Sequence, residues 1–452
     1  MSDFQTVNLQ HLKCLPFDMS AASYVGWMQQ FIPYIHTNWR EETLSWKESC
    51  YICAELSAFP QIAVKGPDAV KLVSDISVNS FKRFPVGAIK HMIHADEAGN
   101  VAFHGLAFRL AEDVVSTHAD AFYIQYHAIK GKYEVTFERD AVAVFQIGGP
   151  RALEAIEQAA KKDIHDLKFM RFMYTEIAGR KVRITRMGMA WTLAYEVHCY
   201  SDEDAIEVYN ALYEAGKPLG MVKLGINTYM SQHTENGYPQ ARLHFPGSSF
   251  QMQEYGRFVA DRMGMSYEML SMAPTPRGTY SSDIKDYCRN PYELGWGHMV
   301  KFDHDFIGRE ALEKIAPSHR KMVTLLWNHE DIMKVYASFY DKGEEPLADM
   351  DFPQEYTLMG PILDNYFQYK VLKDDKVVGV AMWRTYTIYY RESLSLCCID
   401  PEFADIGTEV KILYGDAGKR TMEIRATVAR YPYLDLPSNI TYDVETIPHY
   451  KE

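Results

Sequence analysis

The sequence predicts an α+β fold with mostly antiparallel sheets, followed by a small separate β-barrel or β-sandwich. Two observations support this prediction. Short apolar runs with strand character alternate with amphipathic helical patterns through the first two thirds of the chain. After about residue 316 the pattern changes to β-rich segments joined by short turns. We therefore expect one folded region over residues 1–316, built from two packed α/β subdomains, and a barrel-like domain over residues 317–452.

The clearest elements of the first region are two helices and the strands around them. Residues 65–77 predict a helix with Pro67 in its first turn, where the missing backbone N–H of proline is tolerated. Residues 141–162 predict a short apolar strand, a Gly-Gly-Pro turn and then an amphipathic helix. Residues 180–200 predict two further strands.

The next elements follow from helix ends and turns. Ser201 or Asp202 is expected to cap a helix that ends at Gly216. In the C-terminal domain, residues 377–400 and 407–433 are β-rich with short turns, as in a small barrel or sandwich.

Length and charge limit the class of protein. A chain of 452 residues is longer than one ordinary core supports, so several domains are expected. The formal net charge of -13 argues against nucleic acid or an anionic membrane as the main partner, since both require clustered Lys and Arg. The first twenty residues have no signal-peptide core, and no window approaches the ~20 apolar residues of a membrane span. We therefore expect a cytoplasmic protein.

Metal-binding patterns are incomplete. Cys50 and Cys53 have CxxC spacing, but the chain contains no second CxxC, so two core cysteines are expected. His233 and Glu235 do not form HExxH, and the Asp-His-Asp run at 303–305 has no second histidine at ligand spacing. The seven cysteines are scattered, unlike a disulfide framework. We therefore predict neither a metal centre nor a disulfide-based scaffold.

The stretch 227–240, NTYMSQHTENGYPQ, is polar almost throughout. It contains Tyr229 and Tyr238, nine residues apart, and little that a protein core would bury. Its polarity favours a loop, and composition alone assigns that loop no function.

Six phrases occur in a fixed order along the chain. They are VKGPDAVKLVSDISVNS, DEAGNVAFHGLAFRL, VFQIGGPRALEAI, TRMGMAWTLAYEVHCY, NPYELGWGHMVKFDHDFIGREAL and GTEVKILYG with ATVARYPY. This order resembles the glycine-cleavage T-protein (aminomethyltransferase) family, from about residue 40 to residue 435. The most specific phrase is ELGWGHMVKFDHDFIGREAL, which is too long to agree by chance.

Within this family the chain is similar to the tetrahydrofolate-dependent O-demethylases of lignin-derived aromatics, of the vanillate and syringate type, and to sesamin-type members that cleave methylenedioxyphenyl rings. NWR at 38–40, KFDHDFIGR at 301–309 and the segment 225–240 support this similarity. The resemblance implies two mixed α/β domains and a C-terminal β-barrel around a central folate channel. It also implies tetrahydrofolate as the cofactor.

The resemblance further implies which residues hold the folate. The family phrase RTGYTGEDGFE matches residues 186–196, and its last glutamate, which grips the guanidine-like edge of the pterin, matches Glu196. A carboxylate suits that edge because it accepts two parallel N–H bonds. Gln146 matches a second position whose side chain meets the pterin. Tyr238 falls where these demethylases carry an aromatic residue beside the pterin.

Two departures from the family pattern weigh against glycine cleavage. The first glutamate of TGE is Thr192 here. The aspartate that serves the amine intermediate in aminomethyl-transferring members is matched by Phe103 or His104. An aminomethyltransferase of glycine cleavage and a non-catalytic folate-binding protein therefore remain as alternatives to an ether-cleaving transferase.

Ether cleavage defines the catalytic groups that the chain needs. Folate N5 is a modest nucleophile and phenolate a poor leaving group, so the reaction needs in-line placement and an acid at the ether oxygen. A tyrosine, with an ordinary pKa of about 10, matches a phenol-type leaving group. Tyr229 aligns with the tyrosine that vanillate-type demethylases place at the substrate oxygen, and we predict that it is the general acid. His104 and His233 are secondary candidates for proton transfer.

The substrate is predicted to be a small aromatic ether without charge. Demethylases of aromatic acids need a cation for the substrate carboxylate, but the matching segments 55–59 and 114–120 contain neither Arg nor Lys. His118 is their only titratable base. A methylenedioxyphenyl ring, as in a lignan such as sesamin, would give 5,10-methylene-tetrahydrofolate and a catechol, whereas an aryl methyl ether would give a phenol. The sequence leaves the choice between methyl and methylene donors open.

Overall fold

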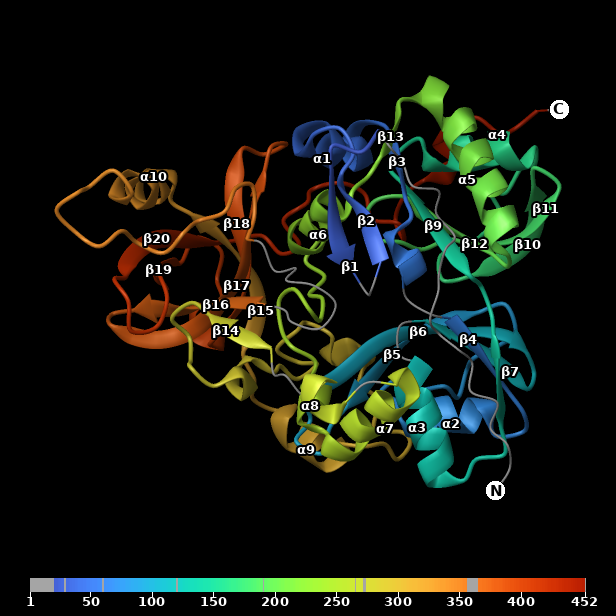
Figure 1. The fold of residues 1–452 in the computed structure, drawn as a ribbon, viewed down its shortest axis with the longest axis horizontal. Coiled ribbons are helices and arrows are strands. Elements are labelled where there is room, and N and C mark those ends of the chain that lie inside the picture. The colour runs from blue at the N-terminus through green and yellow to red at the C-terminus, as the bar shows by residue number, and fades with distance from the viewer. Residues whose placement is uncertain are drawn as a thin grey trace. The chain divides into compact units, whose positions relative to one another are not determined.

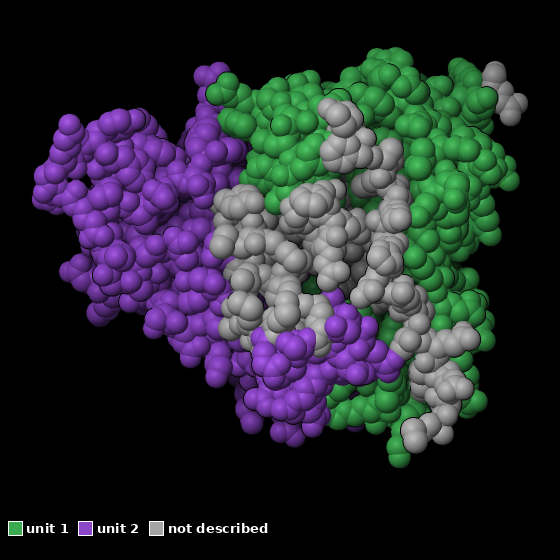
Figure 2. Space-filling model, in the orientation of Figure 1, with its two compact units in different colours: residues 1–93, 104–232, 436–452 green, residues 94–103, 233–435 purple. Residues whose placement is uncertain are grey.

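The computed structural model describes residues 20–451, apart from 28–29, 59–60, 119–120, 190, 265, 271–273 and 356–364. Its contacts divide the chain into two compact units, which Figure 2 shows in different colours. Unit 1 comprises residues 1–93, 104–232 and 436–452, and unit 2 comprises residues 94–103 and 233–435. The domain boundary expected at residue 316 stays a prediction.

Unit 1 contains a six-stranded sheet (Figure 1). Its order is β10 (Phe172–Ile177), β11 (Arg180–Thr185), β12 (Ala194–Cys199), β9 (Ala143–Gly148), β3 (Cys50–Cys53) and β13 (Met221–Lys223). Neighbouring strands are antiparallel except β3 and β13, which are parallel. Both strands predicted over residues 180–200 are present.

Helices cover one face of this sheet and leave the other face polar. α4 (Ala152–Ala160) and α5 (Asp202–Gly216) pack on it around a core that includes Phe145, Tyr195 and Leu212. The Ser201 hydroxyl caps α5 by accepting the backbone N–H of Asp204 at 3.1 Å, as predicted. Because side chains alternate along a strand, residues next to these core positions, among them Gln146 and Glu196, point to the opposite face.

The remaining elements of the first 245 residues form a second sheet and smaller pieces. The five-stranded sheet has the order β5 (Ile89–Ala95), β6 (Val101–Ala111), β7 (Val114–His118), β4 (Gln61–Lys65) and β8 (Thr136–Arg139), with α2 (Ala69–Asp75) and α3 (Ala121–Gly131). β1 (Ser23–Trp27) and β2 (Gln30–Ile35) pair as a hairpin, and α1 (Trp39–Glu48) follows them.

The C-terminal part of unit 2 is a closed six-stranded β-barrel, drawn in orange to red in Figure 1. Its order is β16 (Asn365–Lys373), β17 (Lys376–Thr387), β18 (Glu392–Ile399), β15 (Lys321–Trp327), β20 (Met422–Ala429) and β19 (Glu409–Tyr414), which pairs back to β16. The predicted C-terminal barrel is therefore confirmed. Other elements of unit 2 are α7 (Gln253–Met263), α8 (Tyr267–Leu270), β14 (Thr275–Arg277), α9 (Arg309–Ile315) and α10 (His329–Ser338).

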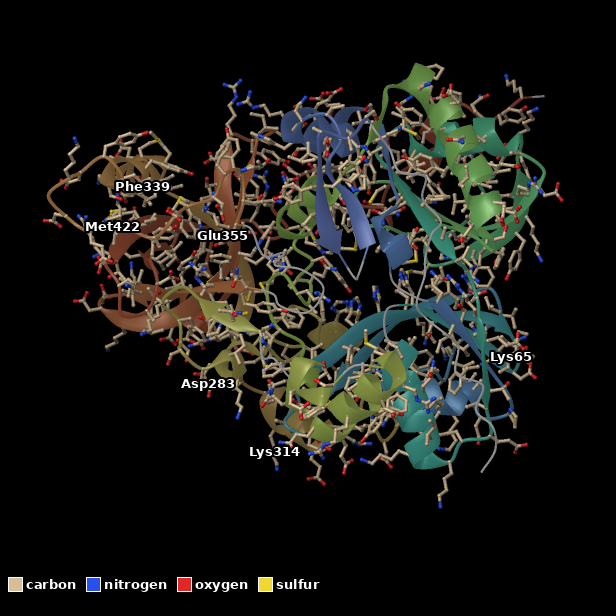
Figure 3. All side chains as sticks on the ribbon, in the orientation of Figure 1. Lys65, Asp283, Lys314, Phe339, Glu355 and Met422 are labelled. Atoms are coloured by element: carbon tan, nitrogen blue, oxygen red, sulfur yellow. The ribbon has the colours of Figure 1, made fainter. Side chains whose placement is uncertain are left out.

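Glu355, labelled in Figure 3, is a buried carboxyl group that belongs to the barrel. It accepts a hydrogen bond from the Tyr369 hydroxyl at 2.7 Å and another from the backbone N–H of Arg384. Burial raises its pKa to about 7, against the opposing effect of Arg384. These contacts tie the segment before β16 to β16 and β17, which is a structural role.

The stretch 227–240 is not a loop throughout, and this prediction was wrong for its first nine residues. α6 (Ile226–Glu235) covers them, and every residue of this helix is buried. The polarity of the helix does not indicate exposure, because its polar side chains meet buried partners, some nearby in sequence, as the carbonyl oxygen of Thr228 is for Ser231, and some distant, as Tyr51 is for Gln232. The carboxylate of Glu42 on α1, for example, accepts the backbone N–H of Gly225 at 2.9 Å, just before the helix begins.

Six of the seven cysteines lie among the described residues, and all six are buried: Cys50, Cys53, Cys199, Cys288, Cys397 and Cys398. Cys14 lies outside the described residues. The prediction that Cys50 and Cys53 are core residues is confirmed for both side chains. Within the described ranges, no helix combines the length and the apolar character that crossing a bilayer requires.

Candidate functional site

Gln146 and Glu196 lie directly opposite each other on β9 and β12, on the polar face of the six-stranded sheet. The Gln146 amide donates to Glu196 Oε1 at 3.4 Å, and the Tyr51 hydroxyl on β3 donates to Gln146 Oε1. Gln146 is fully buried and Glu196 is 3% exposed. The two residues that the family resemblance assigns to the pterin therefore form one contiguous buried group.

The second carboxylate oxygen of Glu196 has no hydrogen-bond partner among the described residues. His198 Nε2 lies 3.5 Å from Glu196 Oε2, which is beyond a normal hydrogen bond. Buried polar atoms are almost always hydrogen-bonded in folded proteins. An oxygen that lacks a donor in this position fits a ligand that brings an N–H group to it.

Burial raises the pKa of Glu196 to about 7, while the Gln146 hydrogen bond and the charge of Arg183 act in the opposite direction. The carboxyl group therefore changes charge near neutral pH. Perturbed carboxyl groups of this kind are concentrated at functional sites, because binding a donor ligand compensates the cost of burying the charge.

We expect Glu196 to make the ligand-free protein less stable as the pH rises from 4.5 to about 7. The folded-state pKa lies above the ordinary value of 4.5, so the folded protein holds the proton more tightly than the unfolded chain does. This stabilisation is fully present below pH 4.5 and is lost as the pH rises through about 7. Glu196→Gln should therefore melt above the wild type at pH 8 but not at pH 5 in scanning calorimetry. The same shift at both pH values would contradict the assignment.

A buried ion pair continues the polar network beyond Glu196. Arg183 is fully buried and lies 2.8 Å from Asp140. It also donates to Gln61 Oε1 at 3.1 Å and faces His198 Nδ1 at 3.2 Å. Burial, with the charge of Arg183, holds the pKa of His198 well below its ordinary value. His198 Nδ1 lies 3.2 Å from Gln61 Oε1 as well, and its Nε2 is the nitrogen nearer to Glu196.

Tyr229 lies in the first half of α6 and is 3% exposed. Gln232 follows it by three residues, a spacing that places both side chains on one side of the helix. Gln232 Oε1 lies 3.5 Å from the Tyr51 hydroxyl, which in turn contacts Gln146. This side of α6 is therefore the side that meets the polar network of unit 1.

Glu42 fixes the start of α6. Its buried carboxylate accepts the backbone N–H groups of His36 at 2.7 Å, Thr37 at 3.0 Å and Gly225 at 2.9 Å. Burial raises the pKa of Glu42, and these backbone donors oppose the rise. The arrangement fastens α1, the end of β2 and the start of α6 to one carboxyl group, which positions Tyr229 on a rigid element.

His104 on β6 pairs with His91 on β5. His91 Nδ1 and His104 Nε2 are 3.1 Å apart, and the two rings are nearly parallel with centroids 5.3 Å apart. One nitrogen has to donate and the other accept, so the pair shares a proton. His104 is therefore part of a histidine pair.

Tyr238 and His233 belong to unit 2. His233 Nδ1 faces the carbonyl oxygen of Tyr238 at 3.0 Å, and burial lowers the pKa of His233 to about 4. The Tyr238 ring lies 5.3 Å from the ring of Trp296, and burial raises the pKa of Tyr238. A neutral His233 whose Nδ1 serves the backbone is less suited to proton transfer than its sequence position implied.

His118 does not supply a cation. It is buried at the end of β7, and burial together with the charge of Arg183 lowers its pKa to about 4. The imidazole is therefore neutral near pH 7. Arg183, the nearby guanidinium, is already paired with Asp140.

Asp163, His165 and His449 form a cluster in unit 1 whose ligand atoms lie within 4.8 Å of one another. The His165 and His449 rings are stacked, with centroids 3.8 Å apart and planes 16° apart. A metal ion lies in the plane of each imidazole that binds it, because the nitrogen lone pair lies in that plane. Stacked rings do not meet this condition. The cluster therefore fits a hydrogen-bonded group of side chains better than a metal site.

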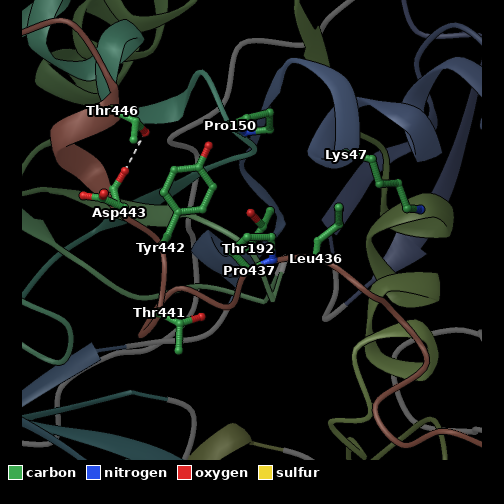
Figure 4. Close-up of a pocket in the computed structure, with 9 residues that line it drawn as sticks. All are labelled: Lys47, Pro150, Thr192, Leu436, Pro437, Thr441, Tyr442, Asp443 and Thr446. Atoms are coloured by element: carbon green, nitrogen blue, oxygen red, sulfur yellow. Dashed lines mark hydrogen bonds between the residues drawn. The ribbon is translucent and has the colours of Figure 1, made fainter.

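A cavity of about 410 Å³ lies in unit 1 where β9 ends and β12 begins (Figure 4). Pro150 follows β9 and Thr192 precedes β12, and both line the cavity. The remaining lining residues are Lys47 and six from the C-terminal segment: Leu436, Pro437, Thr441, Tyr442, Asp443 and Thr446.

Comparison with known proteins identifies the family. The model of the GCVT N-terminal domain matches residues 19–245. A sesamin methylene transferase from Sinomonas sp. (strain No.22) is 37% identical over 427 residues, which cover 92% of this chain and 94% of that protein. The chain belongs to the GCVT family.

Other members of the GCVT family differ in how much they resemble this chain. A syringate O-demethylase from Sphingobium sp. (strain NBRC 103272 / SYK-6) is 32% identical over 89% of this chain and 90% of its own length. An aminomethyltransferase from Halothermothrix orenii is 26% identical over 71% of this chain and 80% of its own length.

A solved structure shares the GCVT fold. The glycine cleavage system aminomethyltransferase T from Bartonella henselae superposes with a TM-score of 0.65 at 14% identity, covering 92% of this chain and 95% of that one. This likeness confirms the predicted T-protein fold.

Several residues of the site are absent from the sequence-based prediction. His198 follows Glu196 by two residues on β12 and pairs with Arg183 on β11, so both lie on the same polar face. Arg183 and His198 could have been predicted from the sequence, because each is a polar residue at an alternate position of an otherwise apolar strand. Tyr51 gave no such signal, because only the pairing of β3 with β9, far apart in sequence, brings it to Gln146. His91 gave none either, and it reaches His104 from the neighbouring strand β5.

Proposed function

We propose that this member of the GCVT family is a tetrahydrofolate-dependent one-carbon transferase that cleaves an aromatic ether. The observation that carries the proposal is its 37% identity, over 92% of the chain, to a sesamin methylene transferase. Identity to the syringate O-demethylase, at 32%, also exceeds the 26% to an aminomethyltransferase. At the level of chemistry, the two more similar relatives share the cleavage of an aryl ether.

The buried residues of unit 1 suit a reduced pterin. Glu196 offers an oxygen without a hydrogen-bond donor among the described residues, and Gln146 offers an amide beside it. A carboxylate and an amide can together accept from and donate to the edge of a pterin ring. Tetrahydrofolate, when bound, supplies the nitrogen that accepts the carbon unit. We assign Glu196 and Gln146 to binding its pterin, with Tyr238 as an aromatic contact.

In this proposal, Tyr229 holds the proton at the ether oxygen. The C–O bond breaks as the tyrosine O–H donates to the departing oxygen, which leaves as a neutral phenol rather than a phenolate. Tyr229 is 3% exposed, so little of the residue faces solvent. The His91–His104 pair is a candidate route for returning a proton to Tyr229. If one histidine accepts a proton while the other releases one, the charge of the pair does not change.

The reaction balances for both donor classes without an oxidant. A methylenedioxy carbon loses two C–O bonds and gains two C–N bonds, and the two displaced protons end on the catechol oxygens. A methyl ether loses one C–O bond and gains one C–N bond, and one proton ends on the phenol.

A neutral ring is favoured as substrate, because His118 is neutral near pH 7 and Arg183 is paired with Asp140.

We expect turnover of neutral methylenedioxyphenyl or methoxyphenyl compounds and little turnover of their ring-carboxylated analogues. The test incubates the protein with tetrahydrofolate and matched pairs of neutral and carboxylated arenes, and identifies the folate product by mass spectrometry. A 5,10-methylene product identifies ring opening, and a 5-methyl product identifies demethylation. Faster turnover of the carboxylated members would overturn the neutral-substrate assignment.

The same assay, with an aminomethyl donor added as a further substrate, separates the alternatives. An aminomethyltransferase would act on an aminomethyl donor and leave every arene unchanged. A non-catalytic folate-binding protein would bind tetrahydrofolate and turn over neither. Either result would overturn the proposed ether cleavage.

A further inference from the structure

Trp191 has a backbone conformation that large side chains rarely adopt. Its φ is 66°, in the left-handed region, where a bulky residue is an outlier. Trp191 lies between β11 and β12, five residues before Glu196. A backbone held in such a conformation requires neighbours that fix it, and such positions are concentrated at functional sites.

The neighbours that fix Trp191 belong to the C-terminal segment 436–450, which we name the C-terminal strap. The Trp191 indole donates to the carbonyl oxygen of Leu436 at 3.0 Å. The backbone N–H of Asn439 donates to the carbonyl oxygen of Trp191 at 2.6 Å. The strap thus binds this residue through both its side chain and its backbone.

Asn439 also binds both ends of the connection from β11 to β12. Its side-chain amide donates to the carbonyl oxygen of Ala194 at 2.8 Å. Arg186 donates from Nε to Asn439 Oδ1 at 3.2 Å and from its terminal nitrogen to the Asn439 carbonyl oxygen at 3.0 Å. Asn439 is 4% exposed, so these bonds are shielded from water.

The connection that the strap holds lies against Gln146. The backbone N–H of Met189 donates to Gln146 Oε1 at 3.3 Å. Gly188 packs so closely that a Cβ atom there would lie 2.6 Å from the Ala194 Cβ and 3.2 Å from Gln146 Cδ. Ala194 begins β12, and Glu196 is the second residue after it.

We infer that the C-terminal strap is a positioning element of the Gln146–Glu196 site, and that Asn439 and Trp191 are its positioning residues. This inference rests on the proposed folate-binding function. Asn439 acts through the β11–β12 connection, which sets the orientation of the Gln146 amide and the start of the strand that carries Glu196. The ligand that the site takes is a reduced folate.

The strap is fastened to unit 1 at other points too, so removal of the Asn439 side chain leaves it attached. Val444 and Ile447 belong to the hydrophobic core of the six-stranded sheet. Further along, His449 Nδ1 lies 2.6 Å from Asp163, and the backbone N–H of Tyr450 donates to Glu157 at 3.2 Å. An Asn439 variant should therefore report on positioning and keep the overall fold.

The experiment compares Asn439→Ala with Ile440→Ala, a matched control on the next strap residue, whose side chain is 68% exposed. The affinity for tetrahydrofolate and the steady-state constants with a methylenedioxyphenyl substrate are measured for both. Asn439→Ala is expected to weaken folate affinity by about tenfold, from lost orientation of buried hydrogen-bonding groups, while kcat at saturating folate changes less than the KM for folate. Ile440→Ala is expected to match the wild type.

Trp191→Gly gives a second, independent readout. Glycine adopts positive φ without strain, so this variant keeps the backbone conformation at residue 191 while the side chain is lost. It loses the bond to Leu436 and should still bind folate more weakly. A purely structural role predicts unchanged folate affinity in both variants, whatever their melting temperatures, and that result would overturn the inference. A wild-type protein that fails to bind tetrahydrofolate would instead overturn the proposed function.

Discussion

Tyr229→Phe is expected to lower the turnover of a neutral aryl ether by about 10²-fold or more, because it removes the proposed acid at the leaving oxygen. The affinity for tetrahydrofolate should stay near that of the wild type, since Tyr229 is not assigned to the pterin. Turnover is measured at saturating folate and arene, and folate affinity by calorimetry. The loss should therefore fall on kcat.

The leaving group gives this prediction a sharper form. A nitro-substituted methylenedioxybenzene releases a more acidic catechol, which needs less help from an acid. The difference between wild type and Tyr229→Phe should therefore shrink with the nitro compound. Tyr340→Phe, at a residue that is 86% exposed, is the matched control for loss of a tyrosine hydroxyl. Equal losses with both substrates would assign Tyr229 to packing rather than to proton donation.

The rigidity of α6 is part of this expectation. A general acid has to lie within hydrogen-bond reach of the departing oxygen, and small displacements are costly. Glu42 fixes the start of α6 through the backbone N–H of Gly225 at 2.9 Å, and Gln232 on the same side of the helix faces Tyr51. Tyr229 therefore belongs to a helix whose position is fixed by these contacts, and not to a surface loop.

Local sequence signals predicted much of the fold. The apolar run before Gly148 and the amphipathic pattern after Arg151 are β9 and α4, because strand and helix periodicity differ and the glycines separate them. Ser201 caps α5 because its hydroxyl accepts the backbone N–H of Asp204. Barrel strands after residue 320 were predicted in the same way, from alternation and short turns.

α6 could not be predicted in this way. A helix that is polar on most sides usually lies at the surface, and its pattern contains no apolar stripe. The residues that bury it lie far away in sequence, as Glu42 does from Gly225. Tertiary contacts thus decided both the secondary structure and the burial of the segment.

The candidate site shows the same division. Resemblance to the family implied Gln146 and Glu196 separately, and the strand register brings them into contact. Arg183, His198 and Asn439 were not predicted, because their relevance depends on which strands and segments pair. The unpaired oxygen of Glu196 is a property of the assembled network that neither composition nor spacing encodes.

Glu196→Gln is expected to weaken tetrahydrofolate binding by ~100-fold, through loss of charge-assisted hydrogen bonds and the introduction of an N–H group that faces other donors. The measurement is folate affinity as a function of pH. In the wild type, affinity should fall as the pH drops below about 7, because the protonated carboxyl group accepts fewer N–H bonds. The variant should bind weakly at every pH, with a flat profile. Glu176→Gln, an exposed residue on β10 of the same sheet, is the matched control.

This variant also separates binding from folding. A residue that serves stability alone would lower the melting temperature and ligand affinity together. Glu196 is expected to do the opposite at pH 8, where its ionised carboxylate is buried without a full set of donors and so destabilises the ligand-free protein. A higher melting temperature together with weaker folate binding in Glu196→Gln would mean that the buried charge of Glu196 destabilises the ligand-free protein and stabilises the folate complex. If affinity instead followed the melting temperature, Glu196 would be a structural residue and the pterin would have to bind elsewhere.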